Sequence, residues 1–216
     1  MNISILLANL PYLLQGALVT LWLAVIVVVA GTVLGAVVGT IASGGGPVLR
    51  TIVTAYVFVF RGIPVLVVMF LGFYTFPAFG IRLSAYAAVT ISMIVYVAAF
   101  VTEAVRGAIA AVPAGQVAAA KSLGMRQLTM LREVVLPQAA RLAIAPILNI
   151  SLMAVKQTSY ASIVGAWELS FAAREIVERT LAAFQIFLGV MLIYFLICYP
   201  ISLLANYCEW KLSFDH

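Results

Sequence analysis

The sequence predicts an all-α integral membrane protein of about five transmembrane helices, forming a single domain over residues 1–216. Of its 216 residues, 65% are hydrophobic and only 9% are charged, and the mean hydropathy is +1.19. A soluble domain of this composition would lack the polar surface needed to cover itself. The basic residues fall between the apolar runs, so the net charge of +5 does not indicate a nucleic-acid partner.

The first predicted span covers residues 17–42, since no charged residue precedes Arg50 and this length exceeds the ~30 Å hydrocarbon core of a bilayer. Its three glycines recur every fourth residue and lie on one helix face, where another helix can approach closely: Gly31, Gly35 and Gly39. The first 16 residues have no basic region and no cleavage-like site. We therefore expect them to lead into this span rather than to form a signal peptide.

The apolar stretch at residues 48–81 is too long for one simple span and carries Arg61 in its middle. Pro64 removes a backbone donor and weakens any helix at that point. In one arrangement, Arg61 lies near the bilayer centre. In the other, residues 48–60 form an interfacial elbow, Arg61 lies at the cytoplasmic surface and the span begins near Gly62. Because a charge at the bilayer centre costs at least ~2.5 kcal/mol, the sequence favours the elbow.

Three further spans are predicted, at residues 83–102, 138–155 and 181–208. Glu103 and Arg106 follow the first of these at i and i+3, where their side chains can form an ion pair. Asn149 is a polar group at membrane depth, and it needs a partner inside the bundle. Residues 167–179 are amphipathic with balanced charges, which predicts a helix on the outer surface.

The longest charge-bearing interval contains residues 112–137. Pro113 and Gly115 interrupt the preceding helix, residues 116–123 predict a short helix, and Gly124 predicts its left-handed end. A second short helix is expected at residues 126–136, with one apolar face and two charged residues turned away from it: Leu128, Leu131 and Val135 against Arg132 and Glu133. From the residues alone this stretch is either an ordinary loop or a docking element for a partner.

The distribution of charge predicts the orientation. Residues 103–141 contain five basic and two acidic residues, whereas residues 156–179 contain three of each. Excess lysine and arginine marks the cytoplasmic side of a membrane protein. We therefore expect the central loop and the C-terminus to be cytoplasmic and the N-terminus to lie outside.

Several motifs resemble those of bacterial ABC-importer permeases of the polar amino-acid (histidine/glutamine/arginine) type. The loop resembles the EAA loop of that family at nine positions: Gly115, Gln116, Ala119, Ala120, Gly124, Leu136, Pro137, Gln138 and Ala139. Residues 60–64 match its F-R-G-x-P motif, and residues 156–159 resemble its K-D-T-S motif. Two positions depart from the pattern. Ala118 replaces the usual glutamate of the loop, and Gln157 replaces the aspartate of the K-D-T-S motif.

This resemblance implies a type I ABC importer permease fold in the bacterial cytoplasmic (inner) membrane. It implies a second permease chain, identical or paralogous, two cytoplasmic ABC ATPase subunits, and an extracytoplasmic substrate-binding protein that delivers an amino acid. ATP and Mg are expected on the ATPase and no cofactor or metal on this chain, which is not expected to be an enzyme. The residues expected to couple to the ATPase are Gly115, Gln116, Ala118, Ala119, Ala120, Lys121, Gly124 and Pro137.

A zwitterionic amino acid that crosses a bundle needs donors for its carboxylate and acceptors for its ammonium group. The spans offer few such groups, and we expect the path at Asn149, Lys156, Thr158 and Ser159, or alternatively near Arg61 and Glu103. The plainer interpretation is that Thr158 and Ser159 bond to backbone while Lys156 reaches the outer surface.

The sequence has no G-x-x-x-x-G-K-[ST] phosphate loop, and its single histidine, His216, leaves acid–base chemistry poorly supplied. Any ATPase is therefore a separate polypeptide. Cys198 and Cys208 are expected to be free thiols. The competing function is a self-contained secondary carrier, but such a carrier would show inverted repeats and paired intramembrane charges.

Overall fold

A computed structural model describes residues 3–213, which form helices and turns with no strand among them; His216 lies outside this range. Four helical stretches in it are long and apolar enough to cross a membrane, and a bent helix pair makes a fifth. The four are α1 (Ile3–Gly44), α4 (Ala85–Ala110), the stretch 127–164 containing α7 (Leu136–Gln157), and α9 (Ala183–Ser213). The prediction of about five spans is confirmed.

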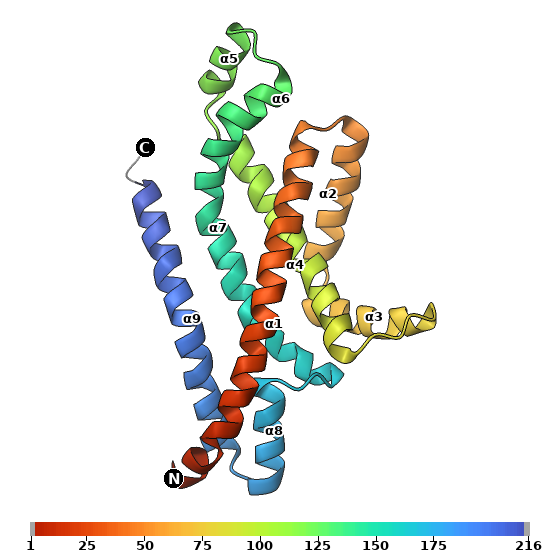
Figure 1. The fold of residues 1–216 in the computed structure, drawn as a ribbon, viewed down its shortest axis with the longest axis vertical. Helices are drawn as coiled ribbons and strands as arrows, with labels where there is room; N and C mark the ends of the chain where they lie inside the picture. Colours follow the sequence, from red (N-terminus) through yellow and green to blue (C-terminus); the bar gives the residue numbers. More distant parts are fainter. Residues whose placement is uncertain (1–2, 214–216) are drawn as a thin grey trace.

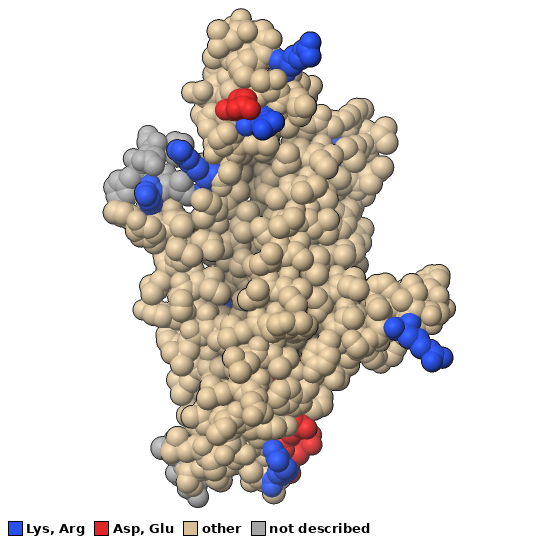
Figure 2. All heavy atoms as spheres, viewed as in Figure 1, with Lys and Arg blue, Asp and Glu red and all other residues tan. Residues whose placement is uncertain are grey.

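Helices α1, α4, α7 and α9 run along the long axis of the molecule, and α9 ends on the α5 side, away from the start of α1 (Figure 1). The first span begins at Ile3, well before the predicted residue 17, and the last continues to Ser213. The C-terminal tail is therefore helical as far as the structure describes it. On the face shown in Figure 2, charged side chains gather at the two ends of the molecule and leave a broad apolar body between them, apart from a basic side chain on the arm formed by α3.

The glycine face of α1 packs directly on α4, as the four-residue spacing predicts. A Cβ added to Gly35 would lie 2.6 Å from the carbonyl oxygen of Ala98, and one added to Gly31 would lie 2.8 Å from Val97. Gly39 is equally close to the backbone of Thr102. The absence of side chains at these positions is what allows the two helix backbones to approach.

The bent pair consists of α2 (Pro47–Gly62) and α3 (Val65–Ala78), which meet at 106°. The break falls at Gly62–Pro64, as Pro64 predicts. The elbow arrangement is wrong, because α2 runs beside α1 and α4 along the bundle and it is α3 that turns away from it (Figure 1). Arg61 lies over the ring of Phe100, 5.6 Å from its centroid, in the second half of α4. Its aromatic neighbour therefore belongs to a span, while the Arg61 side chain itself is exposed.

The loop after α4 consists of α5 (Ala114–Ser122), α6 (Gln127–Met130) and the π-turn η1 (Leu131–Val135). The short helix predicted at residues 116–123 is confirmed. The second predicted helix is not separate, since α6 and η1 continue into α7 through residues with right-handed helical dihedral angles. The fourth span accordingly begins well before residue 138.

At the opposite end of the molecule, α7 is followed by a 3₁₀ segment η2 (Thr158–Val164) and by α8 (Leu169–Thr180). The inner face of α8 is fully buried, and Leu169 and Ile176 pack with α1 and α9 in one apolar cluster. The prediction of an amphipathic helix here is confirmed. A larger cluster joins α1, α2, α3, α4 and α7, so α1 is the element shared by both cores.

Candidate functional site

Helix α5 stands at the tip of the molecule, beyond the ends of the spans (Figure 1). Ala120 is buried, at 3% exposure, and it anchors the helix. The remaining predicted coupling residues of the loop are exposed: Gly115, Gln116, Ala118, Ala119, Lys121 and Gly124. Gly124 has φ = +72°, which is the left-handed conformation that ends a helix, and its N–H donates to the carbonyl of Lys121 at 2.9 Å. Pro137 occupies the first turn of α7.

Two leucines on this loop are strongly exposed. Leu123 is 82% exposed and Leu128 is 76% exposed, and both stand among exposed basic residues. Of the three residues predicted to share one apolar face, Val135 is buried and Leu131 packs beside it, whereas Leu128 is exposed. The Arg132–Glu133 ion pair points into solvent as predicted. An exposed apolar pair with a basic rim is typical of a docking surface, which is one of the two interpretations that the sequence leaves open for this stretch.

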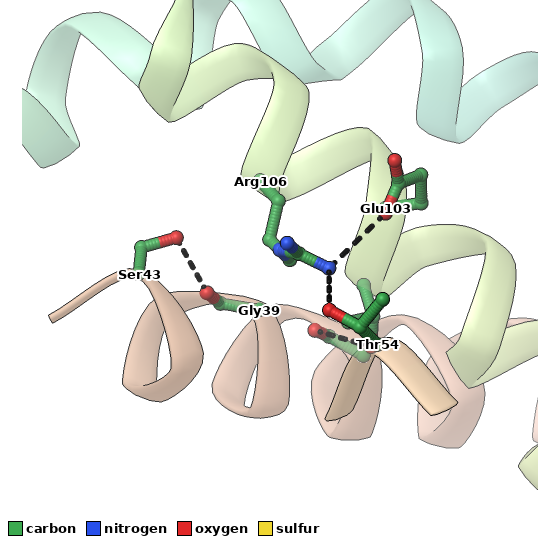
Figure 3. A network of polar contacts seen from close by, with 7 residues as sticks. Gly39, Ser43, Thr54, Glu103 and Arg106 are labelled. Carbon is green, nitrogen blue, oxygen red and sulfur yellow. Dashed lines mark hydrogen bonds and ion pairs between the residues drawn. The ribbon is translucent and has the colours of Figure 1, made fainter. Parts of the chain in front are cut away.

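The predicted Glu103–Arg106 pair forms, with 3.4 Å between Oε2 and the guanidinium. The same guanidinium nitrogen donates to the hydroxyl of Thr54 at 3.3 Å, so the pair ties α4 to α2 (Figure 3). Glu103 and Arg61 line one cavity of about 430 Å³ on this face. Two of the predicted path residues are thus brought together.

Two of the other predicted path residues on α7 lie on its side toward α9. Asn149 finds its partner on α9, where its Nδ2 donates to Oε1 of Glu209 at 2.8 Å. Lys156, two turns further along α7, lines a cavity of about 360 Å³ between α7 and α9, beside Cys198 and Tyr199. Both cysteines are free thiols, as expected.

Thr158 and Ser159 use their hydroxyl groups locally. Thr158 is fully buried and donates to the carbonyl of Val155 at 2.7 Å, and Ser159 donates to the carbonyl of Lys156 at 2.8 Å. Gln157 beside them is different, because its Oε1 is buried and accepts no hydrogen bond from any described residue. Such an orphan acceptor is costly, and the only sign of it in the sequence is the departure from the K-D-T-S motif at this position.

A buried carboxylate that the sequence did not single out holds together the end of the molecule opposite α5. Glu168 is fully buried and caps α8, with Oε1 accepting from the backbone N–H of Ser170 at 2.8 Å and of Phe171 at 3.0 Å. Its Oε2 accepts from the hydroxyls of Thr20 on α1 and Tyr194 on α9. Burial raises the pKa of Glu168, and these hydrogen bonds oppose that shift.

A second carboxylate on α8 lies nearer the surface. Glu175 accepts hydrogen bonds from the Tyr12 hydroxyl of α1 and from Trp167 Nε1, the latter at 2.9 Å. The hydrogen bond from Tyr12 holds the pKa of Glu175 below its usual value. Arg179 lies over the ring of Tyr12. Helix α8 is therefore fixed to the start of α1 by both polar and apolar contacts.

A bundle of five spans with a protruding loop helix at one end defines a membrane transport permease of type I importer fold. The family described as binding-protein-dependent transport system inner membrane component matches residues 31–213. The chain belongs to that family, and it is an inner-membrane permease component.

Curated relatives match over nearly the whole chain. The probable glutamine ABC transporter permease protein GlnM of Bacillus subtilis is 34% identical over 213 residues, which is 99% of both chains. The L-cystine transport system permease protein TcyB of the same organism is 34% identical over 94% of this chain and 87% of its own length. The glutamine transport system permease protein GlnP of Escherichia coli is 29% identical over 94% of each.

Solved structures agree with the fold. A crystal structure of an amino acid ABC transporter with histidines has a TM-score of 0.90 and 26% identity, and the match covers 98% of this chain and 99% of that one. The inward-facing MetNI methionine ABC transporter has a TM-score of 0.77 at 20% identity, covering 93% and 95% of the two chains. The second likeness supports the fold alone.

Proposed function

We propose that this chain forms the translocation path of an ATP-driven importer of polar amino acids, with glutamine as the first substrate to test. The relatives named for amino acids cover almost the whole chain, and the structural neighbour at 26% identity is an amino acid transporter. The observation that carries the proposal is α5, a nine-residue helix of small exposed side chains that stands clear of the bundle. A helix this short is marginal alone and gains stability by docking.

The proposed partners on the α5 side are two ABC ATPase subunits, which hold ATP and Mg. Leu123 and Leu128 would enter apolar pockets on an ATPase, and the basic residues around them would contact its acidic groups. A second permease chain, identical or paralogous, completes the path, and an extracytoplasmic binding protein delivers the substrate. This arrangement places α5 and the C-terminus in the cytoplasm and the N-terminus outside, consistent with the excess of basic residues around α5.

ATP binding would close the ATPase subunits and move α5, and the bundle would then exchange inward-open for outward-open access as rigid elements. The continuous helical segment α6–η1–α7 supports this proposal, because it connects the loop to the outer end of the fourth span without interruption. The bent helix pair α2–α3 supports it as well. No chemical step is assigned to this chain.

For the substrate path we propose the outer end of α7. Lys156 would attract the carboxylate of the amino acid from the cavity it lines beside α9. The orphan Oε1 of Gln157 offers an acceptor for the ammonium group, while Asn149 adds a polar group two turns away on the face toward α9. Thr158 and Ser159 would contribute through the backbone carbonyls and geometry of η2, since their hydroxyls are already bonded. Arg61 and Glu103 form the alternative path along α2 and α4.

The test is uptake of radiolabelled glutamine, histidine, arginine and cystine into proteoliposomes that contain the permease, its ATPase and its binding protein. We expect ATP-dependent uptake of at least one of these. Asn149→Ala and Lys156→Gln should reduce uptake without lowering basal ATPase activity. Uptake that needs neither ATP nor the ATPase subunit would identify a secondary carrier and overturn the proposal.

A further inference from the structure

Three adjoining cavities form a groove between α2 and α4 on the side of the molecule nearest α5. Glu103 and Arg106 line two of them, of about 400 and 430 Å³. A third cavity, of about 440 Å³, adjoins the second, because Thr54 and Phe58 line both. Arg50 lines both the third cavity and the first. We call this continuous surface, with Arg61 at its far end, the arginine groove.

The arginine groove carries more positive charge than the protein neutralises. It contains three guanidinium groups and one carboxylate, and Arg106 already pairs with that carboxylate. Among the described residues, the guanidinium groups of Arg50 and Arg61 have no hydrogen-bond or ion-pair partner, and that of Arg61 lies over the ring of Phe100. Each guanidinium has five N–H donors, so the groove offers many donors to an anion from outside the chain.

Two of these arginines lie near helix ends. Arg50 is in the first turn of α2, and Arg106 is one turn before the end of α4, beside the end of α1 at Ser43 (Figure 3). Apolar side chains on α2 flank the groove and are strongly exposed, with Val48 at 72%, Ile52 at 61% and Phe58 at 80%. The surface is thus cationic near the start of α2 and the end of α4, and apolar along α2. This combination matches an anionic amphiphile.

We propose that the arginine groove binds the phosphate group of an anionic phospholipid in the leaflet on the α5 side. Arg50 binds the phosphate through bidentate hydrogen bonds, and Arg106 approaches it from α4. The hydroxyl of Thr54 adds a further hydrogen-bond donor. The acyl chains lie along Phe58 and Ile52. Such a lipid would join α2 to α4 near the base of the loop, and this role does not depend on which substrate the permease carries.

The test measures phosphatidylglycerol that remains bound to the purified permease–ATPase complex by native mass spectrometry. The complex is first reconstituted into vesicles of phosphatidylcholine mixed with phosphatidylglycerol. We expect Arg50→Gln and Arg106→Gln each to lower retention roughly fivefold, and Arg50→Lys to lower it less. Arg82→Gln is the matched control, because Arg82 is exposed outside the groove and the net charge changes by the same amount.

Two results would overturn the proposal. One is equal retention by the Arg50→Gln/Arg106→Gln complex and the Arg82→Gln complex, each with an unchanged elution profile. The other is stabilisation of the lipid-free complex by inorganic phosphate to the same unfolding temperature as by phosphatidylglycerol, since the groove would then be a site for free anions. An increase in the KM for amino-acid uptake in Arg50→Gln, with lipid retention unchanged, would assign the groove to the substrate path.

Discussion

Asn149 of α7 and Glu209 of α9 are joined by a hydrogen bond of 2.8 Å between Nδ2 and Oε1. The two residues are sixty positions apart in the chain, and this bond connects the last two spans on the side of α7 that also carries Lys156. The polar partner that Asn149 requires at membrane depth is therefore an acid from the C-terminal end of α9, a segment that the sequence pattern assigns to a tail.

Asn149→Ala should destabilise the purified chain in detergent by about 1 kcal/mol, because it removes a hydrogen bond to a charged acceptor and leaves Glu209 without its donor. Asn149→Asp should destabilise more, since two carboxylates would then face each other. Thermal unfolding of both variants checks this. In the double variant Asn149→Ala/Glu209→Gln, the two effects should not add, and full additivity would show that the contact contributes nothing.

Gly35→Ala should destabilise the fold by about 1–3 kcal/mol, because its new Cβ would lie 2.6 Å from the carbonyl oxygen of Ala98 and would push α1 away from α4. Gly107→Ala is a matched control on α4, where an added Cβ has no atom within 4 Å. That change should stabilise the helix by about 0.5–1 kcal/mol. Opposite shifts in unfolding temperature are expected, and two shifts of the same sign would contradict the packing described for α1.

The buried Glu168 should make stability fall as pH rises. Burial raises its pKa above the ordinary 4.5, so the folded protein binds a proton that the unfolded chain releases. Its contribution is fully present below pH 4.5 and is lost as the pH rises through the folded pKa. The lowered pKa of Glu175 has the opposite effect, because its contribution to stability is lost as the pH falls below 4.5. The two residues therefore affect stability in different pH ranges.

Glu168→Gln keeps the shape of the side chain and removes its titration. Unfolding temperatures measured across the range above pH 4.5 should therefore decline with pH in the unsubstituted protein and stay flatter in this variant. Parallel profiles for the two proteins would show that another group governs the dependence. Glu168→Ala should lower stability at every pH, because the backbone donors at Ser170 and Phe171 lose their acceptor.

Labelling of single cysteines should report the orientation. In a background without Cys198 and Cys208, a cysteine at Gln127 is expected to react with impermeant thiol reagents from the cytoplasmic side only, and one at Glu178 from outside only. Both positions are exposed. Ala173, which the sequence pattern suggests as the outer position, is fully buried against α1 and α9 and is unsuitable. Labelling from the reverse sides would invert the proposed topology.

The spans and their closest contact were predictable from the sequence because each rests on a local pattern. Long apolar runs predict crossing helices, and glycines at every fourth residue predict the face on which α1 meets α4. The i, i+3 spacing of Glu103 and Arg106 predicts their ion pair in the same way. These features depend on helical geometry alone.

The remaining features depend on tertiary contacts. The direction of α2 before the break at Pro64 is set by packing on α1 and α4. The cost of a charge in lipid favoured the elbow, but that local argument does not include these packing contacts. Glu168 is an ordinary surface acid by sequence, and only the fold brings Thr20 and Tyr194 to it. Leu128 follows a helical pattern, but none of the elements between residues 3 and 213 covers it.

The central claim is that α5 couples ATP hydrolysis to transport, and the most direct measurement is the number of amino-acid molecules imported per ATP hydrolysed by the reconstituted complex. Gly124→Pro should abolish the turn after α5, because proline cannot adopt φ = +72°. Gly80→Pro is the matched control, since Gly80 has φ = +78° and also donates its N–H to a turn carbonyl at 2.9 Å. We predict an unchanged ratio for Gly80→Pro and a ratio near zero for Gly124→Pro, with ATP hydrolysis no longer stimulated by substrate. An unchanged ratio in a fully assembled Gly124→Pro complex would contradict the account.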